Sequence, residues 1–288
     1  MNRERGYTVV ELVVGTAVML AMTSAVMTLL HDGLVRTPVL EDAADLHQRS
    51  RVAADALAAD LRAAGNGTWS GPLAAVLPAV EPRGAGGLPG AASGEAVTIR
   101  YVPPLGARSR LTQPLDPAST IATVDLAGCA LWTTACGFTA GMRALVFDGA
   151  GQMDGLLVEA IGPGVLALGA SSAPRSVTYP AGVEIVQIVE ASYEVDAASR
   201  QLRRAEGGGS FAVADNVEAL TFEYRGDGLA SLPLSGFQDG PFRGSGLRLF
   251  DADLLRVRTV TATLRLAGGS RHSAAVTAKV TVALRIGG

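Results

Sequence analysis

The chain has 288 residues, of which 48% are hydrophobic, and it contains 35 glycines and 14 prolines. This mixture favours short strands joined by many turns over a helical bundle or a disordered tail. The formal net charge is only −3 at pH 7, which argues against a nucleic-acid-binding protein because such proteins carry a basic surface.

The N-terminus combines a short basic segment with a long apolar one. Residues 1–6 carry two arginines and one glutamate, and a run without charged side chains extends from Leu12 to Leu30. As a helix this run covers about 28 Å, close to the ~30 Å hydrocarbon core of a bilayer. The basic segment ahead of it predicts a cytoplasmic N-terminus, with the rest of the chain outside. A secretory signal peptide is the alternative, but its apolar core spans only about 7–15 residues.

Glu11 stands at the start of the apolar run. A carboxylate in a membrane segment is costly, and such residues are normally retained because they have a partner or a function. An acid near the N-terminus of a helix is also stabilised by the helix dipole, and it can stay hydrated at the membrane interface. Both interpretations, an assembly role and a local structural role, are open at this point.

The sequence Gly6-Tyr7-Thr8-Val9-Val10-Glu11-Leu12 resembles the prepilin motif of type IV pilins and type II secretion pseudopilins. By this resemblance, an inner-membrane prepilin peptidase cuts after Gly6 and methylates the new amine of Tyr7, where family members usually have Phe. The resemblance also implies that Glu11 pairs with the α-amine of a neighbouring subunit when helices pack in a filament. The implied partners are the peptidase, other minor and major pilins and the inner membrane, with no cofactor.

A second, amphipathic helix is predicted from Leu40 to about Ala64. Pro38 disfavours helical geometry at Thr37, so a kink or break is expected there, and Gly65-Asn66-Gly67 is a stop signal. The expected apolar face is Leu46, Ala53, Leu57, Leu61 and Ala64, against a polar face of Asp45, Arg49, Asp55, Asp60 and Arg62. This helix resembles the corresponding helix of minor pilins of the PilW kind and of the J-type pseudopilin.

The remainder is predicted to be a β-rich head. Residues 70–94 are rich in Pro, Gly and Ala, which indicates an extended connection. In the last predicted pair, Leu254–Leu266 and Val276–Ile286, the second strand alternates apolar and polar residues, and the first changes apolar parity near Thr259-Val260, which predicts a bulge or strong twist. The other expected strands are Val97–Val102, Thr120–Leu126, Arg143–Phe147, Leu156–Ile161, Val183–Val195, Gln201–Ala205 and Val217–Tyr224.

The expected fold class is therefore α+β and pilin-like, with a long N-terminal helix packed on a mainly antiparallel sheet. The hairpin over residues 193–204 and the strand that follows it resemble the head of PilW-type minor pilins. The predicted segments are a leader over 1–6, a transmembrane and filament helix over 7–37, an amphipathic helix over 38–66 and the head over 67–288.

Cys129 and Cys136 lie close together in a segment placed outside the cytoplasm, where a disulfide can persist. We predict that they pair and close a small loop displaying Leu131 and Trp132. The loop is interpreted either as a structural staple or as a contact for a neighbouring minor pilin.

The sequence shows no recognisable catalytic motif, so we expect that the chain is not an enzyme. The three histidines, His31, His47 and His272, show no zinc-binding spacing, and there is neither a nucleophile elbow nor a Walker loop. The acids of residues 147–155 could bind calcium, but their spacing is not that of an EF-hand, so a hairpin turn is preferred. Arg225-Gly226-Asp227 is likewise interpreted as turn chemistry.

The sequence thus predicts a minor pilin that initiates, primes or caps type IV pilus assembly. It is expected in the inner membrane as a single-pass protein with a periplasmic head, and later in the pilus or at the cell surface. A J-type minor pseudopilin of a type II secretion system is the first alternative. A membrane-anchored adhesin or enzyme is the second.

Overall fold

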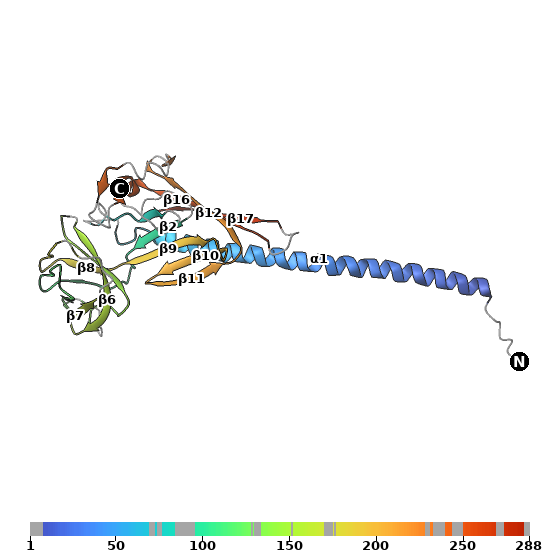
Figure 1. Cartoon of the computed structure of the whole chain (residues 1–288), viewed down its shortest axis with the longest axis horizontal. Helices are drawn as coiled ribbons and strands as arrows, with labels where there is room; N and C mark the ends of the chain where they lie inside the picture. The colour runs from blue at the N-terminus through green and yellow to red at the C-terminus, as the bar shows by residue number, and fades with distance from the viewer. Residues whose placement is uncertain are drawn as a thin grey trace.

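A computed structural model describes residues 8–68, 73, 77–83, 96–127, 129, 134–150, 152–169, 175, 177–227, 231–232, 240–243, 250–268 and 274–284. In this part of the chain, one long helix projects from a head of antiparallel strands (Figure 1). The structure is therefore α+β, as expected, and its N-terminal helix and C-terminal head lie along one long axis.

Helix α1 (Val9–Ala63) contains 55 residues. It begins after Thr8, whose hydroxyl accepts a hydrogen bond from the backbone N–H of Glu11 at 3.3 Å. It ends at the predicted stop signal, where Gly65 adopts a φ of 74° that suits a residue without a side chain. The backbone N–H of Gly65 then donates to the carbonyl of Arg100 at 2.9 Å, which ties the end of the helix to the head.

Of the kink or break predicted at Pro38, the break was wrong, because α1 runs through this position as one uninterrupted helix. A proline removes one backbone hydrogen bond and crowds the preceding turn, but a long helix with bonded turns on both sides can absorb this locally. The predicted apolar face of the C-terminal half is confirmed, and all five of its members are buried: Leu46, Ala53, Leu57, Leu61 and Ala64.

Two antiparallel sheets form the part of the head into which α1 packs. The four-stranded sheet has the order β13-β12-β16-β17, with β12 (Val217–Arg225), β13 (Ser231–Leu232), β16 (Thr259–Leu266) and β17 (Val276–Ala283). The five-stranded sheet has the order β1-β2-β9-β10-β11, with β1 (Val80–Arg83), β2 (Ala96–Tyr101), β9 (Val189–Asp196), β10 (Gln201–Glu206) and β11 (Gly209–Ala214).

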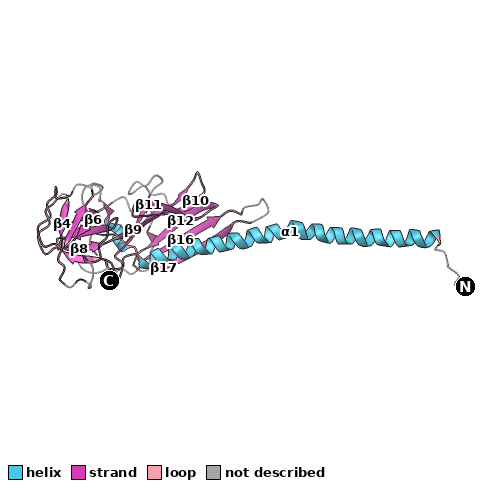
Figure 2. Ribbon diagram, turned by 90° about the horizontal axis from the view of Figure 1, so that it is seen from below, coloured by secondary structure: helices cyan, strands magenta, loops and turns pink. Residues whose placement is uncertain are grey.

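Both sheets share one core with the C-terminal half of α1, which contacts β17, β16, β11 and β2 (Figure 2). We call this unit the body. Its core includes Leu57 of the helix, Ile99 and Tyr193 of the five-stranded sheet, and Leu264 of the four-stranded sheet. The expected alternation in β17 is present, because Val276, Ala278 and Val280 are partly buried against this core.

Of the bulge or strong twist predicted near Thr259-Val260, the bulge was wrong. The pairing of β16 with β17 is regular from Thr259 to Leu266, and the register shift lies instead in β12, between Val217 and Ala219. The change of apolar parity has another cause: Leu254 belongs to a 3-10 helix, η5 (Ala252–Arg256), so the strand starts later than predicted. A short pair of strands, β14 (Phe242–Arg243) and β15 (Phe250–Asp251), precedes this helix.

A third sheet forms a separate lobe at the end of the head farthest from the N-terminus (Figure 1). Its order is β3-β8-β5-β6-β7-β4, with β3 (Arg108–Arg110), β4 (Ile121–Thr123), β5 (Arg143–Phe147), β6 (Met153–Gly162), β7 (Val165–Leu168) and β8 (Glu184–Gln187).

This sheet closes on itself. Leu111, just after β3, forms a bridge with Val124, just after β4. The backbone N–H of Asp125 donates to the carbonyl of Arg110 at 2.8 Å, and that of Thr112 donates to the carbonyl of Thr123 at 2.9 Å. The two outer strands of the sheet are therefore joined, and we call residues 102–188 the barrel.

The predicted strand Val183–Val195 is two strands in different sheets. Its first part is β8 of the barrel, its second part is β9 of the body, and Ile188 stands between them. Most of the predicted connection at 70–94 lies outside the described residues, but Val80–Arg83 within it forms strand β1. Seven strands in the described part of the chain were not predicted: β1, β3, β7, β11, β13, β14 and β15.

Candidate functional site

The N-terminal half of α1 is apolar and uncovered. Val9–His31 has a mean hydropathy of 2.0, and none of it is buried in the molecule. Leu12, Met19 and Leu29 are 65%, 71% and 74% exposed. Such a surface is unfavourable in water at about 25 cal/mol per Å² of apolar area. The segment is long enough to cross a bilayer, at about 1.5 Å per residue.

The threonine hydroxyls of this segment are bonded to its own backbone. The hydroxyl of Thr16 donates to the carbonyl of Leu12 at 3.0 Å, and that of Thr23 donates to the carbonyl of Met19 at 2.8 Å. Hydroxyl groups bonded in this way tolerate an apolar medium, because no donor is left without a partner. The segment is thus suited to lipid or to contact with other apolar helices.

Glu11 occupies the third position of α1, three residues after the helix cap Thr8. This is the spacing of a capping box, in which the side chain at the cap accepts from the N–H three residues later. That bond is present, since the Glu11 N–H donates to Thr8 Oγ1. Among the described residues Glu11 has no ion-pair partner, so its charge faces outward in the first helical turn, where the helix dipole favours it. The other two predicted N-terminal site residues, Gly6 and Tyr7, lie outside the described residues.

Within the body, a buried polar cluster joins α1 to the five-stranded sheet. Asp60 was predicted on the exposed face of the helix, but the structure buries it. Its Oδ2 atom accepts from the hydroxyl of Tyr193 at 2.7 Å and from Nε of Arg204 at 2.6 Å. Its Oδ1 atom lies 3.5 Å from the hydroxyl of Tyr101. The helical pattern could not predict this burial, because the partners of Asp60 lie on strands β2, β9 and β10.

The electrostatics of this cluster fix its protonation. Burial and the hydrogen bond to Asp60 raise the pKa of Tyr193 far above the usual value of a phenol. Burial alone would lower the pKa of Arg204, but its hydrogen bonds to Asp60 and Glu206 outweigh that effect and raise it. The cluster therefore holds a neutral phenol and a charged guanidinium around one carboxylate, which is a structural arrangement rather than an acid–base pair.

A second ionic network connects the body to the barrel. Arg100, whose side chain is 12% exposed, lies 2.5 Å from Glu81 and 2.8 Å from Glu190, both in neighbouring strands of the five-stranded sheet. Burial lowers the pKa of Arg100, but the two glutamates raise it by more. Glu190 also accepts from Nη1 of Arg143, a residue of the barrel, at 2.8 Å. Sequence reasoning missed this network because its members are far apart in the chain.

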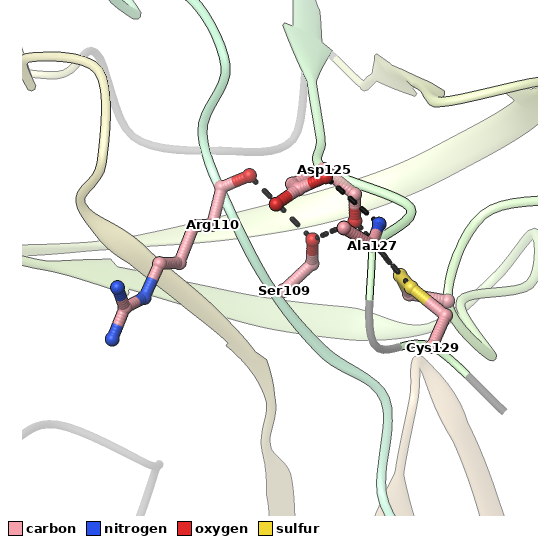
Figure 3. The surroundings of a disulfide bond; sticks show 6 residues. Ser109, Arg110, Asp125, Ala127 and Cys129 are labelled. Carbon is pink, nitrogen blue, oxygen red and sulfur yellow. Dashed lines mark hydrogen bonds between the residues drawn. A yellow bond between two sulfur atoms is a disulfide. The ribbon is translucent and has the colours of Figure 1, made fainter.

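The structure places a disulfide between Cys129 and Cys136, whose Cα atoms are 5.0 Å apart. Figure 3 shows its surroundings: the carbonyl oxygen of Asp125 lies 3.4 Å from the sulfur of Cys129 and accepts from the hydroxyl of Ser109 at 2.6 Å. The bond therefore lies where β3 and β4 close the barrel. The two large residues expected in the loop, Leu131 and Trp132, lie outside the described residues.

The acids after β5 do not converge. The carboxylate of Asp148 accepts from the backbone N–H groups of Ala150 and Gln152 at 3.0 and 2.8 Å, which is ordinary turn chemistry. Asp154 points into the barrel, where it accepts from the hydroxyl of Tyr179 at 2.8 Å. Among the described residues there is no group of three or more potential metal ligands.

Comparisons with family models, with curated proteins and with solved structures find no match to this chain. The class of protein is therefore defined by the architecture alone. It is a chain with one N-terminal helix apolar enough to span a membrane and a β-rich head into which the same helix continues, a layout compatible with that of pilins.

Proposed function

We propose that this chain is a minor pilin that initiates, primes or caps a type IV pilus. The observation that carries the proposal is the division of one 55-residue helix, whose first half is apolar and uncovered and whose second half is built into the core of the head. The first half anchors the precursor in the inner membrane, with the N-terminus in the cytoplasm and the head in the periplasm. The same surface then packs against the helices of other pilins.

The apolar side chains of the first half of α1 suit a transfer from the bilayer into a filament. Its side chains are as apolar as lipid tails, so they leave the bilayer favourably only for another apolar environment, which neighbouring helices provide. Gly15 and Gly33 have open space where a side chain would stand, so other helices can approach closely there. Prepilin peptidase removes residues 1–6 and methylates Tyr7, and Glu11 supplies the counter-charge for the amine of a neighbouring subunit.

The size of the head supports a minor over a major subunit. The barrel adds a second lobe beyond the body, and such bulk repeated at every position would crowd a regular filament. A J-type minor pseudopilin would use the same helix in a shorter filament, and neighbouring genes distinguish the two. A membrane-anchored adhesin or enzyme is the second alternative, and the uncovered helix favours the pilin over it because that helix offers a surface for assembly.

The proposal is tested by the processing of the N-terminus. Mass spectrometry of the protein from cells with active prepilin peptidase should show an N-methylated Tyr7 as the first residue. Cells without the peptidase are the control, and they should retain Met1 and residues 2–6. Recovery of the uncut chain in both kinds of cell would overturn the assignment.

A further inference from the structure

The barrel is inserted between two strands that are direct neighbours in the body. Strands β2 and β9 pair in antiparallel register, and the last pair is Tyr101 with Val189. The chain leaves the body after Tyr101, builds all six strands of the barrel, and returns at Val189. Both connections to the body therefore lie side by side, at what would otherwise be a hairpin turn.

The barrel satisfies its own packing and polar groups. Among the described residues its core cluster has 16 buried members, and all of these lie between Ala107 and Ile185. The buried Tyr179 and Asp154 bond to each other, and the buried Arg175 donates to the carbonyl of Asp116 at 3.0 Å. Closure of the sheet leaves no outer strand that needs a partner from the body. These are the features of a unit with its own fold.

The contact between barrel and body is local. It includes a third apolar cluster, in which Leu73, Leu77 and Val102 meet Leu145, Phe147 and Val186, and the ion pair between Arg143 and Glu190. Met153 of the barrel also packs against the body core, and the backbone N–H of Val102 donates to the carbonyl of Asn66 at 2.8 Å. That ion pair is partly exposed, so it contributes only about 0–1 kcal/mol. If the barrel were absent, Arg100 would still have Glu81 and Glu190, because both belong to the body. The fully buried members of the body core among the described residues all lie outside residues 102–188, so removal of the barrel would take away only the covering contact of Met153.

We propose that residues 102–188 form an accessory domain inserted into a filament-type body, and that anchoring, processing and assembly depend on the N-terminal helix and the body without the barrel. The domain lies at the end of the molecule opposite the N-terminus (Figure 1), so its removal leaves the membrane-facing helix unchanged. Independence of the barrel rests on topology and packing. Its dispensability in assembly rests, in addition, on the proposed function.

Independence is tested by hydrogen exchange on the full chain in detergent, with two matched cavity variants. Leu166→Ala opens the barrel core and Leu264→Ala opens the body core, and the wild-type side chains are 0% and 2% exposed. Each should speed exchange of the slowest amides at least about tenfold in its own unit and by less than about twofold in the other. Equal acceleration of both units by either variant would overturn the inference.

Dispensability is tested by deleting residues 102–188 and joining Tyr101 to Val189 through Asn-Gly, a sequence that favours a tight hairpin. Leu73→Ser and Leu77→Ser replace the apolar side chains that the barrel covers. The variant should match the wild type in membrane level, in cleavage after residue 6 and in recovery from sheared filaments. Loss of the variant from the membrane, while the full chain is present and cleaved, would refute dispensability. If the full chain itself is not cleaved, the proposed function fails, and hydrogen exchange still decides the independence of the barrel.

Discussion

Nε of Arg204 lies 2.6 Å from Oδ2 of Asp60, so a strand and the helix are joined by residues 144 positions apart in the chain. The side chains are only 14% and 11% exposed, and the hydroxyl of Tyr193 donates to the same carboxylate oxygen. Asp60 is thus satisfied only when α1 has the correct rotation and axial position against the sheet. This contact fixes the direction in which the apolar half of the helix leaves the head.

Replacing Asp60 with Asn should destabilise the head. The variant leaves the buried guanidinium of Arg204 with Glu206 as its remaining ionic partner, and breaking a buried pair costs about 3–5 kcal/mol. Because the pair keeps some exposure, we expect a loss of about 2–4 kcal/mol in the free energy of unfolding, measured by urea denaturation in detergent. The exposed Asp55→Asn on the same helix is the control and should change it by less than about 0.5 kcal/mol. Equal effects of the two variants would contradict a role for the buried pair.

The pKa of Tyr193 predicts a loss of stability at alkaline pH. Burial and the bond to Asp60 raise its pKa in the folded state, whereas the unfolded phenol ionises near pH 10. The folded state thus keeps a proton that the unfolded state releases. Its stabilising effect is complete below about pH 10 and is lost as the pH rises further, by up to about 1.4 kcal/mol per pH unit. Denaturation series from pH 8 to 11.5 measure this slope.

Tyr193→Phe provides the control for that experiment, because it removes the ionisable group and should flatten the slope above pH 10. Burial also raises the pKa of Tyr224, so part of the slope should remain in the variant. Absorbance at 295 nm reports ionisation directly. Titration of Tyr193 near pH 10 without unfolding would show that its hydroxyl is not held as described.

The disulfide should stabilise the barrel and not the body. Non-reducing peptide mapping of protein from the periplasm should find Cys129 linked to Cys136. A Cys129→Ser, Cys136→Ser double variant should lower the stability of the barrel by about 2 kcal/mol, as expected for a short loop. Hydrogen exchange separates the two units, and amides of the body core should keep their protection. Free thiols in the exported protein would refute the pairing.

Local periodicity explains which parts of the fold were predicted from the sequence. The apolar face around Leu57 and the alternation around Val280 are repeated patterns within one element, and both are present. Local periodicity gave a wrong prediction where the structure depends on pairing with residues far away in the chain. Val183–Val195 looks like one strand because both halves are apolar, and only pairing to two different sheets divides it at Ile188.

The same limit applies to the candidate site. The apolar segment that begins at Leu12 could be predicted from the sequence, because composition alone identifies a helix that is apolar enough to span a membrane. The helical pattern groups Asp60 with polar residues. Its burial depends on Tyr193 and Arg204, which belong to the five-stranded sheet. Closure of the barrel through Leu111 and Val124 is likewise a long-range event without a local signal.

Two roles of Glu11 predict different results for three variants. In the first role its charge pairs with the amine of a neighbouring subunit in the filament. In the second it completes the cap that begins with Thr8, whose hydroxyl already accepts from the Glu11 N–H at 3.3 Å. Glutamine keeps the length and the capping ability of glutamate but has no charge. Valine has neither the capping ability nor the charge, and Thr8→Ala removes the cap while it keeps the charge.

We expect Glu11→Gln and Glu11→Val to lose assembly to the same extent, and Thr8→Ala to retain it. An unpaired amine in an apolar filament core costs about 3 kcal/mol or more, which is a factor of more than about 100 in association. Membrane level should be preserved in all three, because the two Glu11 variants remove a charge and Thr8→Ala removes a hydroxyl, and each change makes the segment more apolar. The measurements are membrane level, N-terminal cleavage and recovery of the variant in sheared filaments. If Glu11→Gln assembles normally while Glu11→Val and Thr8→Ala do not, Glu11 acts as a helix cap and its charge has no part in assembly.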